Sequence, residues 1–230
     1  MGLNFKQLYD SESSTYTYIL YDSNSLEGVV IDPVLEQFNR DVTLIKQLNL
    51  KILFVLETHI HADHITSSSK LRQELGSKVA VSKAANAECA DINFDDGHEF
   101  IFGGFKINAI ATPGHTDTCT TFNCENMLFT GDVLLIRGCG RTDFQQGSSE
   151  KLFNSVREKI FSFADETIIY PGHDYKGFTS SSVGEEKLFN ARLSLDKTKE
   201  EFVEIMENLK LDHPKKIKEA VPANLKCGKE

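Results

Sequence analysis

Apolar residues fall into short runs along the chain, and the spacing within each run predicts a strand or a helix. In the first part of the chain, alternating or continuous apolar runs predict strands over residues 15–20, 28–32, 51–56 and 78–82. Apolar residues recur at helical spacing over residues 34–50, which predicts an amphipathic helix. Another helix is expected over about residues 63–75. The chain therefore begins with strands that alternate with helices.

The rest of the chain continues this alternation and adds a hairpin. Gly103-Gly104 separates two extended runs, as expected of a tight turn between antiparallel strands. Strands are expected over residues 99–102, 105–111, 118–124, 127–133 and 166–170, and helices over residues 148–162 and 195–209. Hairpins and crossovers together favour an α/β (α+β) fold of two mixed β-sheets flanked by helices. We expect one domain over residues 1–230, with a short C-terminal helical extension over about residues 180–230.

The charge balance narrows the classes of partner. The 230-residue chain has 25 Lys and Arg against 34 Asp and Glu, which gives a formal net charge of −9. An acidic surface repels a phosphate backbone, so no nucleic-acid partner is expected, and an anionic small molecule would need its own local cations. No apolar run approaches the length of a membrane-spanning helix, about 18 residues. Because residues 1–14 lack the features of a targeting segment, we expect a cytoplasmic protein.

The cysteines lead to an expectation about redox state. There are five, and none lies in a Cys-x-x-Cys pair: Cys89, Cys119, Cys124, Cys139 and Cys227. Without a secretory signal, a reducing compartment is the default. Each cysteine is therefore expected to be a reduced, small, buried apolar residue.

Histidine and aspartate gather at the ends of the expected strands. The candidate ligands are His59, His61, Asp63 and His64 in one cluster, His115 and His173 each after Pro-Gly, and Asp132 after Thr-Gly. Tight turns of Pro and Gly direct one side chain away from a strand end. Taken alone, a His after Pro-Gly is seldom a ligand, and Asp63 is more often a helix N-cap. Together, these residues predict a metal site for Zn, Fe or Mn, and the spacing allows one ion or two.

The order of these motifs resembles the metallo-β-lactamase superfamily. HxHxDH, a His after Pro-Gly, a Gly-Asp and a further His follow one another over residues 59–173. The resemblance implies a metallo-β-lactamase-type αββα sandwich with the metal at one edge. It leaves the reaction open, because hydrolases, flavoprotein partners and oxygenases share this scaffold.

A second segment resembles a narrower family. Residues 136–147, IRGCGRTDFQQG, are similar to the signature of the persulfide dioxygenases, also called sulfur dioxygenases. HDYKG, EEKLFNARLS and AVPANLKCG extend the resemblance over nearly the whole chain. The implied reaction is glutathione-dependent: O2 and water oxidise the sulfane sulfur of glutathione persulfide to sulfite, and glutathione is released.

The resemblance also implies a ligand set. One Fe(II) per chain would be held by a 2-His-1-carboxylate triad, which consists of His59, His115 and Asp132. The remaining candidates would orient these ligands and fill the position of a second metal. They are His61, Asp63, His64 and His173.

Glutathione carries two carboxylates, and the resemblance indicates which residues would bind it. It points to Arg141, Asp143, Tyr175 and Arg192. Arginine can bind a carboxylate through two parallel hydrogen bonds. Asp143 could instead only orient Arg141, and Tyr175 could serve packing alone. Without the family, Arg192 on a helix would be a solvated surface residue.

Further partners follow from the resemblance as well. It suggests a homodimer, and a sulfurtransferase that delivers persulfide would act in trans. Cys139 lies inside the signature and is expected to pack. Cys227 matches a cysteine near the C-terminus of the family, and its role stays open because the triad needs no protein thiol.

Two other functions remain open. A glyoxalase II-like glutathione thioester hydrolase would use the same histidines to hold two metals and a bridging hydroxide. Those relatives typically have a different segment after Gly-Asp and a longer C-terminal helical domain. A non-catalytic glutathione or persulfide sensor is the third alternative, and the complete ligand set argues against it. Metal identity and stoichiometry separate the two enzymes.

Overall fold

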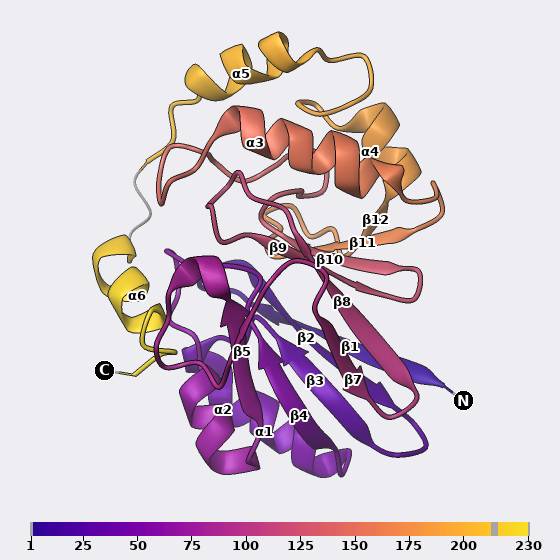
Figure 1. Ribbon diagram of the computed structural model, residues 1–230, viewed down its shortest axis with the longest axis vertical. Coiled ribbons are helices and arrows are strands. Elements are labelled where there is room, and N and C mark those ends of the chain that lie inside the picture. The colour runs from indigo at the N-terminus through magenta and orange to yellow at the C-terminus, as the bar shows by residue number, and fades with distance from the viewer. Residues whose placement is uncertain (1, 213–215, 230) are drawn as a thin grey trace.

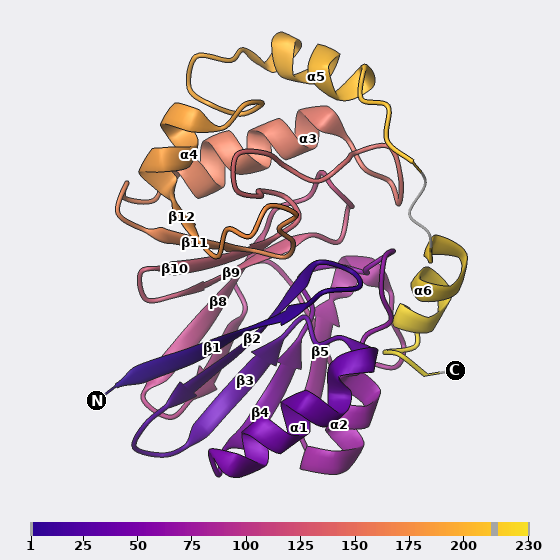
Figure 2. The same ribbon diagram turned by 180° about the vertical axis from the view of Figure 1, so that it is seen from behind.

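The computed structural model describes residues 2–212 and 216–229, which form two β-sheets packed face to face (Figure 1). Helices cover the outer side of each sheet, as the view from behind also shows (Figure 2). Within the described residues each sheet has six strands. The expected arrangement of two mixed sheets flanked by helices is therefore confirmed.

The first sheet is built from the N-terminal strands in chain order. These are β1 (Leu3–Asp10), β2 (Thr15–Asp22), β3 (Glu27–Ile31), β4 (Lys51–Leu56), β5 (Lys78–Ser82) and β6 (Ile92–Phe94). Strands β1 to β3 pair antiparallel, whereas β3 to β6 pair parallel. Parallel neighbours need a crossover. Helices α1 (Phe38–Gln47) and α2 (Ser68–Leu75) provide the crossovers before and after β4.

The second sheet is an antiparallel meander extended by one parallel strand. Its strands are β7 (Glu99–Phe102), β8 (Phe105–Ala111), β9 (Thr120–Cys124), β10 (Met127–Gly131), β11 (Ile168–Pro171) and β12 (Ser181–Ser182). Strand β11 pairs parallel with β10. The crossover between them is α3 (Ser149–Asn154), which continues through a π-helical turn (Ser155–Lys159) and a 3-10 turn (Ile160–Ser162).

Aromatic side chains fill the space between the sheets. Tyr18 on β2 packs edge-on against Phe129 on β10, with 4.9 Å between the ring centroids. Phe100 and Phe122 are buried in the same cluster. Each fully buried side chain of this size contributes about 1.5–3 kcal/mol to stability. This packing fixes the position of the two sheets relative to each other. It therefore also fixes the positions of the strand ends at the edge of the sandwich.

The C-terminal helices divide between the two layers. Helices α4 (Val183–Phe189) and α5 (Lys199–Glu207) lie with the second sheet, where Phe202 packs on Phe153 of α3 at 5.6 Å. Helix α6 (Ile217–Asn224) instead lies beside the first sheet and α2 (Figures 1 and 2). No helix in the described ranges is long and apolar enough to cross a membrane. The single-domain organisation stays a prediction.

Local departures from the predicted elements occur next to the candidate ligands. Residues 63–67 form a loop rather than the first turn of a helix, so Asp63 is not an N-cap. Arg192 lies in a turn after α4 and not on a helix. Strand β1 was not predicted, because its apolar residues do not alternate regularly with polar ones along the sequence LNFKQLYD.

The expectation of five reduced cysteines is wrong for two of them. Cys89 forms a disulfide with Cys227, which is 138 positions away in the sequence. The other three are free and buried, as expected: Cys119, Cys124 and Cys139. Burial raises the pKa of the Cys139 thiol to about 11, and this cysteine packs against Met206 as predicted.

Candidate metal centre and substrate cavity

The candidate ligands meet at one edge of the sandwich because each one follows a strand that ends there. His59 lies just after β4 of the first sheet. His115 follows β8, and Asp132 and His173 follow the adjacent strands β10 and β11 of the second sheet. One potential ligand atom from each of His59, His115 and Asp132 lies within 4.8 Å of the others. The three side chains assigned to one ion therefore converge.

A chain of hydrogen bonds orients His59. The Thr58 hydroxyl donates to Asp32 Oδ2 at 2.7 Å. That hydroxyl lies 3.0 Å from His59 Nδ1 and accepts its proton, which leaves Nε2 with a lone pair. A ligand imidazole held through its second nitrogen is typical of metal centres.

His115 and Asp132 are oriented in the same manner. His115 Nδ1 donates to the carbonyl of Arg141 at 2.6 Å, so Nε2 faces Asp132 Oδ2 at 3.7 Å. Gly140 makes this approach feasible: a Cβ there would lie 2.5 Å from the Asp132 carbonyl and 2.8 Å from His115 Nδ1. The glycine of the IRGCGR segment thus permits the close packing of two candidate ligands.

The protonation states fit metal binding. Burial lowers the pKa of His59 well below its usual range, and the neighbouring His61 and His115 lower it further. Burial would raise the pKa of Asp132, but His173, His115 and His59 hold it below its ordinary value. A neutral imidazole and an ionised carboxylate are the forms that bind a cation. The donor set therefore fits a metal ion with two nitrogen ligands and one oxygen ligand.

A second group lies beside the triad. Ligand atoms of His61, Asp63 and His64 also lie within 4.8 Å of one another. His64 Nε2 is buried and has no hydrogen-bond partner among the described residues. His61 is shared with another buried group, because its Nε2 lies 3.1 Å from Asp32 Oδ1 and 3.6 Å from Glu57 Oε2. Burial would lower the pKa of His61, but these carboxylates raise it to about 9.

His173 connects the two groups through both ring nitrogens. Nδ1 is 2.6 Å from Asp132 Oδ1, and Nε2 is 2.9 Å from Asp63 Oδ2. Burial would lower the pKa of His173, but the two carboxylates raise it well above its usual range. In this arrangement His173 orients carboxylates and does not present a lone pair.

A cavity of about 490 Å³ opens onto the centre, which is within the range of small-molecule sites. Its wall includes the triad members His115 and Asp132 together with Asp63 and His173. Four cations also contribute to the wall: Arg137, Arg141, Lys176 and Arg192. An otherwise acidic protein thus places several basic side chains beside the candidate metal centre.

Three of the four predicted glutathione-binding residues line the cavity. Arg141, Tyr175 and Arg192 line the cavity, whereas Asp143 does not. Asp143 binds the Arg141 guanidinium at 2.6 and 2.7 Å, so in this structure it orients the arginine. The Tyr175 ring stacks on His173 and is 70% exposed. Arg192 donates to the carbonyl of Cys139 at 3.1 Å.

Two cavity cations were missed in the sequence analysis. Arg137 lies inside the IRGCGR segment and pairs with Glu185 and Glu186, while Lys176 lies inside HDYKG. Their position within matched segments was the available signal. Cys227, whose role was open, does not line the cavity and pairs with Cys89 instead.

Comparisons with known proteins agree with this geometry. Residues 12–91 and 90–173 match the family model of the metallo-beta-lactamase superfamily. The mitochondrial persulfide dioxygenase ETHE1 of Homo sapiens is 51% identical over 226 residues, which make up 97% of this chain and 88% of that protein. The corresponding protein of Mus musculus is 50% identical over the same share of both chains.

A solved structure is equally similar. The crystal structure of ETHE1 from Myxococcus xanthus matches with a TM-score of 0.96 and 48% identity, covering 98% of this chain and 100% of that chain. Such similarity extends beyond the shared scaffold to the IRGCGRTDFQQG segment and the C-terminal helices. With its ligand motifs in matching order and its strand ends converging on one centre, the chain belongs to the persulfide dioxygenases of the metallo-beta-lactamase superfamily.

Proposed function

We propose that this persulfide dioxygenase oxidises glutathione persulfide at a single Fe(II) held by His59, His115 and Asp132. The observation that carries the proposal is the convergence of these three side chains within 4.8 Å. Two imidazoles and one carboxylate form the facial triad of non-haem Fe(II) oxygenases and leave open positions for substrate and O2. Fe(II), when bound, supplies the electrons that make O2 reactive, which Zn(II) cannot do.

The reaction balances without a further reductant. Glutathione persulfide, O2 and water give glutathione, sulfite and two protons. The bond between the two sulfur atoms breaks, and the sulfane sulfur is oxidised while O2 is reduced. Two oxygen atoms of sulfite come from O2 and the third comes from water.

The contacts of His173 support one ion rather than two. Both of its ring nitrogens already bind carboxylates, one on Asp132 and one on Asp63. A second ion on Asp63 and His64 would have to displace the hydrogen bonds that Asp63 makes with both histidines. In a binuclear thioester hydrolase these side chains would be ligands, so that alternative is less favoured.

The charge of glutathione matches the cavity. Its carboxylates need cations, and Arg192 and Lys176 line the cavity beside Tyr175. Arg137 is paired with two glutamates and Arg141 with Asp143, so these two arginines are already neutralised. We assign the carboxylates of glutathione to Lys176 and Arg192, and the contact with the peptide backbone of glutathione to Arg141 and Tyr175. Asp143 holds Arg141 in place.

Metal analysis together with O2 uptake tests the function. Protein purified without added metal should contain about one Fe per chain, consume O2 when given glutathione persulfide, and release sulfite. His115→Ala should lose the metal and the activity. His98→Ala, which removes an exposed histidine outside the centre, should keep both. About two Zn per chain with thioester hydrolysis and no O2 uptake would establish the hydrolase instead.

Assembly and location complete the proposal. Leu188 and Phe189 at the end of α4 are 68% and 63% exposed, and they offer an apolar surface for a homodimer. Light scattering after size-exclusion chromatography measures the molecular mass in solution, which distinguishes a monomer from a homodimer. The cytoplasmic location, and a sulfurtransferase that supplies persulfide in trans, are parts of the same proposal.

A further inference from the structure

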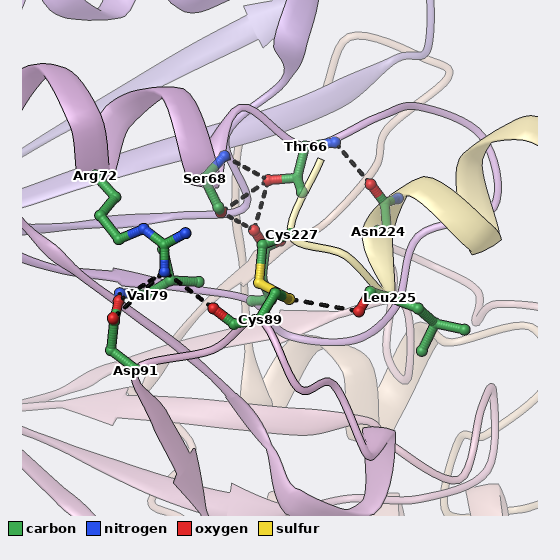
Figure 3. Close-up of a disulfide and its surroundings, with 10 residues drawn as sticks. Thr66, Ser68, Arg72, Val79, Cys89, Asp91, Asn224, Leu225 and Cys227 are labelled. Carbon is green, nitrogen blue, oxygen red and sulfur yellow. Dashed lines mark hydrogen bonds and ion pairs between the residues drawn. A yellow bond between two sulfur atoms is a disulfide. The ribbon is translucent and has the colours of Figure 1, made fainter. Parts of the chain in front are cut away.

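The C-terminal end of α6 contacts the loop that carries the ligand cluster. Figure 3 shows Asn224, the last residue of α6, facing Thr66, and Cys227 joined to Cys89. We call residues 224–228 the C-terminal clamp. The loop in contact with it, residues 61–66, contains His61, Asp63 and His64.

Asn224 uses every hydrogen-bonding group of its side chain on this loop. Its Nδ2 donates to the carbonyls of His61 and His64, each at 2.9 Å. Its Oδ1 accepts from the backbone N–H of Thr66 at 2.9 Å. The side chain is 3% exposed, so water does not replace these partners readily. An amide is the side-chain group that can donate to two carbonyls and accept from an N–H at once.

Cys227 and Gly228, which also belong to the clamp, lie close to the loop and to the start of α2. The carbonyl of Cys227 accepts from the backbone N–H of Ser69, at the start of α2, at 3.0 Å. Gly228 has a φ of +75°, and a Cβ there would lie 2.0 Å from the Thr66 carbonyl. This position thus requires glycine for both its conformation and the space.

The disulfide ties the clamp to a segment that is itself anchored. Arg72 of α2 donates to the carbonyl of Cys89 at 2.9 Å (Figure 3). Asp91, two residues after Cys89, accepts from Arg72 and from the backbone N–H of Val79 on β5. The disulfide therefore joins the clamp to a segment that hydrogen bonds hold to α2 and to β5 of the first sheet.

The opposite side of the loop has its own contacts. Thr66 forms a β-bridge with Val34, and Ser67 N–H donates to the Pro33 carbonyl. These contacts fix the C-terminal end of the loop but not the carbonyls of His61 and His64. Loss of Asn224 would leave two buried carbonyls without a donor, which favours a different backbone path between the two histidines.

We infer that Asn224 is a positioning residue that holds residues 61–66 in the conformation needed at the metal centre, and that the Cys89–Cys227 disulfide keeps Asn224 in place. The inference rests on the proposed metal centre, because the loop begins two residues after His59. Asn224 itself does not line the cavity, so it acts through the loop and not on the substrate.

The disulfide makes this positioning sensitive to thiols. Two thiols can reduce the bond: one attacks a disulfide sulfur, the second releases the resulting mixed disulfide, and the thiols leave as their own disulfide while Cys89 and Cys227 gain two electrons and two protons. Disulfides in reducing compartments are usually transient and redox-sensing. Reduction should loosen the clamp without removing any side chain from it.

Amide hydrogen exchange on metal-free protein tests the role of Asn224 independently of activity. In Asn224→Asp, an isosteric change that removes both donors, amides of residues 61–66 should exchange at least about tenfold faster than in the unchanged protein. Asn208→Asp, at the exposed C-cap of α5, is the matched control and should leave them unchanged. Unchanged exchange in Asn224→Asp would overturn the inference.

Metal release gives the second readout. With Co(II) as a spectroscopic probe, Asn224→Asp and the unchanged protein after reduction by a phosphine should both release the ion at least about tenfold faster. The double variant Cys89→Ser/Cys227→Ser should release it equally fast with or without reductant. If reduction of the unchanged protein alters neither exchange nor release, the role of the disulfide is wrong. Failure of O2 uptake with these shifts intact would instead reject the proposed reaction and leave the clamp.

Discussion

His173 Nδ1 and Asp132 Oδ1 lie 2.6 Å apart, and this contact turns the other carboxylate oxygen of Asp132 toward His115. Strands β10 and β11 are parallel neighbours, so the two residues that follow them are placed side by side by the sheet itself. Orientation of the carboxylate of this candidate ligand is thus a consequence of strand pairing.

Substitution of His173 should weaken the centre through Asp132. His173→Ala should reduce metal affinity about 10–100-fold, the usual effect of removing a group that orients a ligand. His173→Asn can keep a donor near the position of Nδ1 and should recover part of the affinity. Competition with a chelator measures both values. Equal affinity in the unchanged protein and His173→Ala would contradict this role.

Substitution of Lys176 should act on substrate binding alone. Lys176→Met keeps much of the side-chain length and removes the charge, so KM for glutathione persulfide should rise about tenfold with kcat nearly unchanged. Lys151→Met on α3, outside the cavity, serves as the control. Steady-state O2 uptake provides both constants. A fall in kcat at constant KM would show that Lys176 does not bind the ground-state substrate.

Stability should depend on pH through Asp41. Burial raises the pKa of this carboxyl from 3.8 to about 6, although Arg40 partly opposes the shift. The folded state therefore binds this proton more tightly than the unfolded state, and the resulting stability is lost as the pH rises through about 6. Asp41→Asn should raise the free energy of unfolding by about 1–3 kcal/mol at pH 8 and have no such effect near pH 4.

Urea denaturation at both pH values measures the Asp41 effect. Asp165→Asn, an exposed carboxylate paired with Lys187, is the control and should change stability little at either pH. A gain of the same size at pH 4 and pH 8 would mean that Asp41 is not the group responsible.

The number of reactive cysteines shows directly whether the disulfide is present. Denatured protein should react with alkylating reagent at three cysteines, and at all five after reduction. Cys89→Ser/Cys227→Ser should lower the free energy of unfolding by about 2–4 kcal/mol, because the bond closes a long loop in the unfolded chain. Mass spectrometry and urea denaturation provide these values. Five reactive thiols without reductant would refute the bond.

The strand ends were the most predictable part of the site. Alternating and continuous apolar runs identified β4, β8, β10 and β11 within a few residues, and the candidate ligands follow these strands. Residues 63–67 were mispredicted as helix because their local pattern continues that of α2. In the structure, hydrogen bonds to Asn224 and to Pro33 hold this segment as a loop, and neither partner is close in sequence.

Pairings between distant residues could not be predicted either. Nothing near Cys89 or Cys227 in the sequence marks them as partners, since connectivity cannot be deduced from spacing. The pairing of Arg137 with Glu186 depends on how α4 packs on the segment that contains Arg137. By contrast, the roles of Arg141 and Arg192 came from matched segments, and the structure places both arginines at the cavity.

His59 comes from the first sheet, while His115 and Asp132 come from the second. An ion bound by all three would crosslink the two halves of the sandwich, and neither half alone would offer more than part of its coordination. The free energy of ion binding would then stabilise the packing of one sheet on the other. The melting temperature of the protein should therefore rise with the concentration of free metal. The supply of that metal would in that case set the stability of the fold as well as the activity of the site.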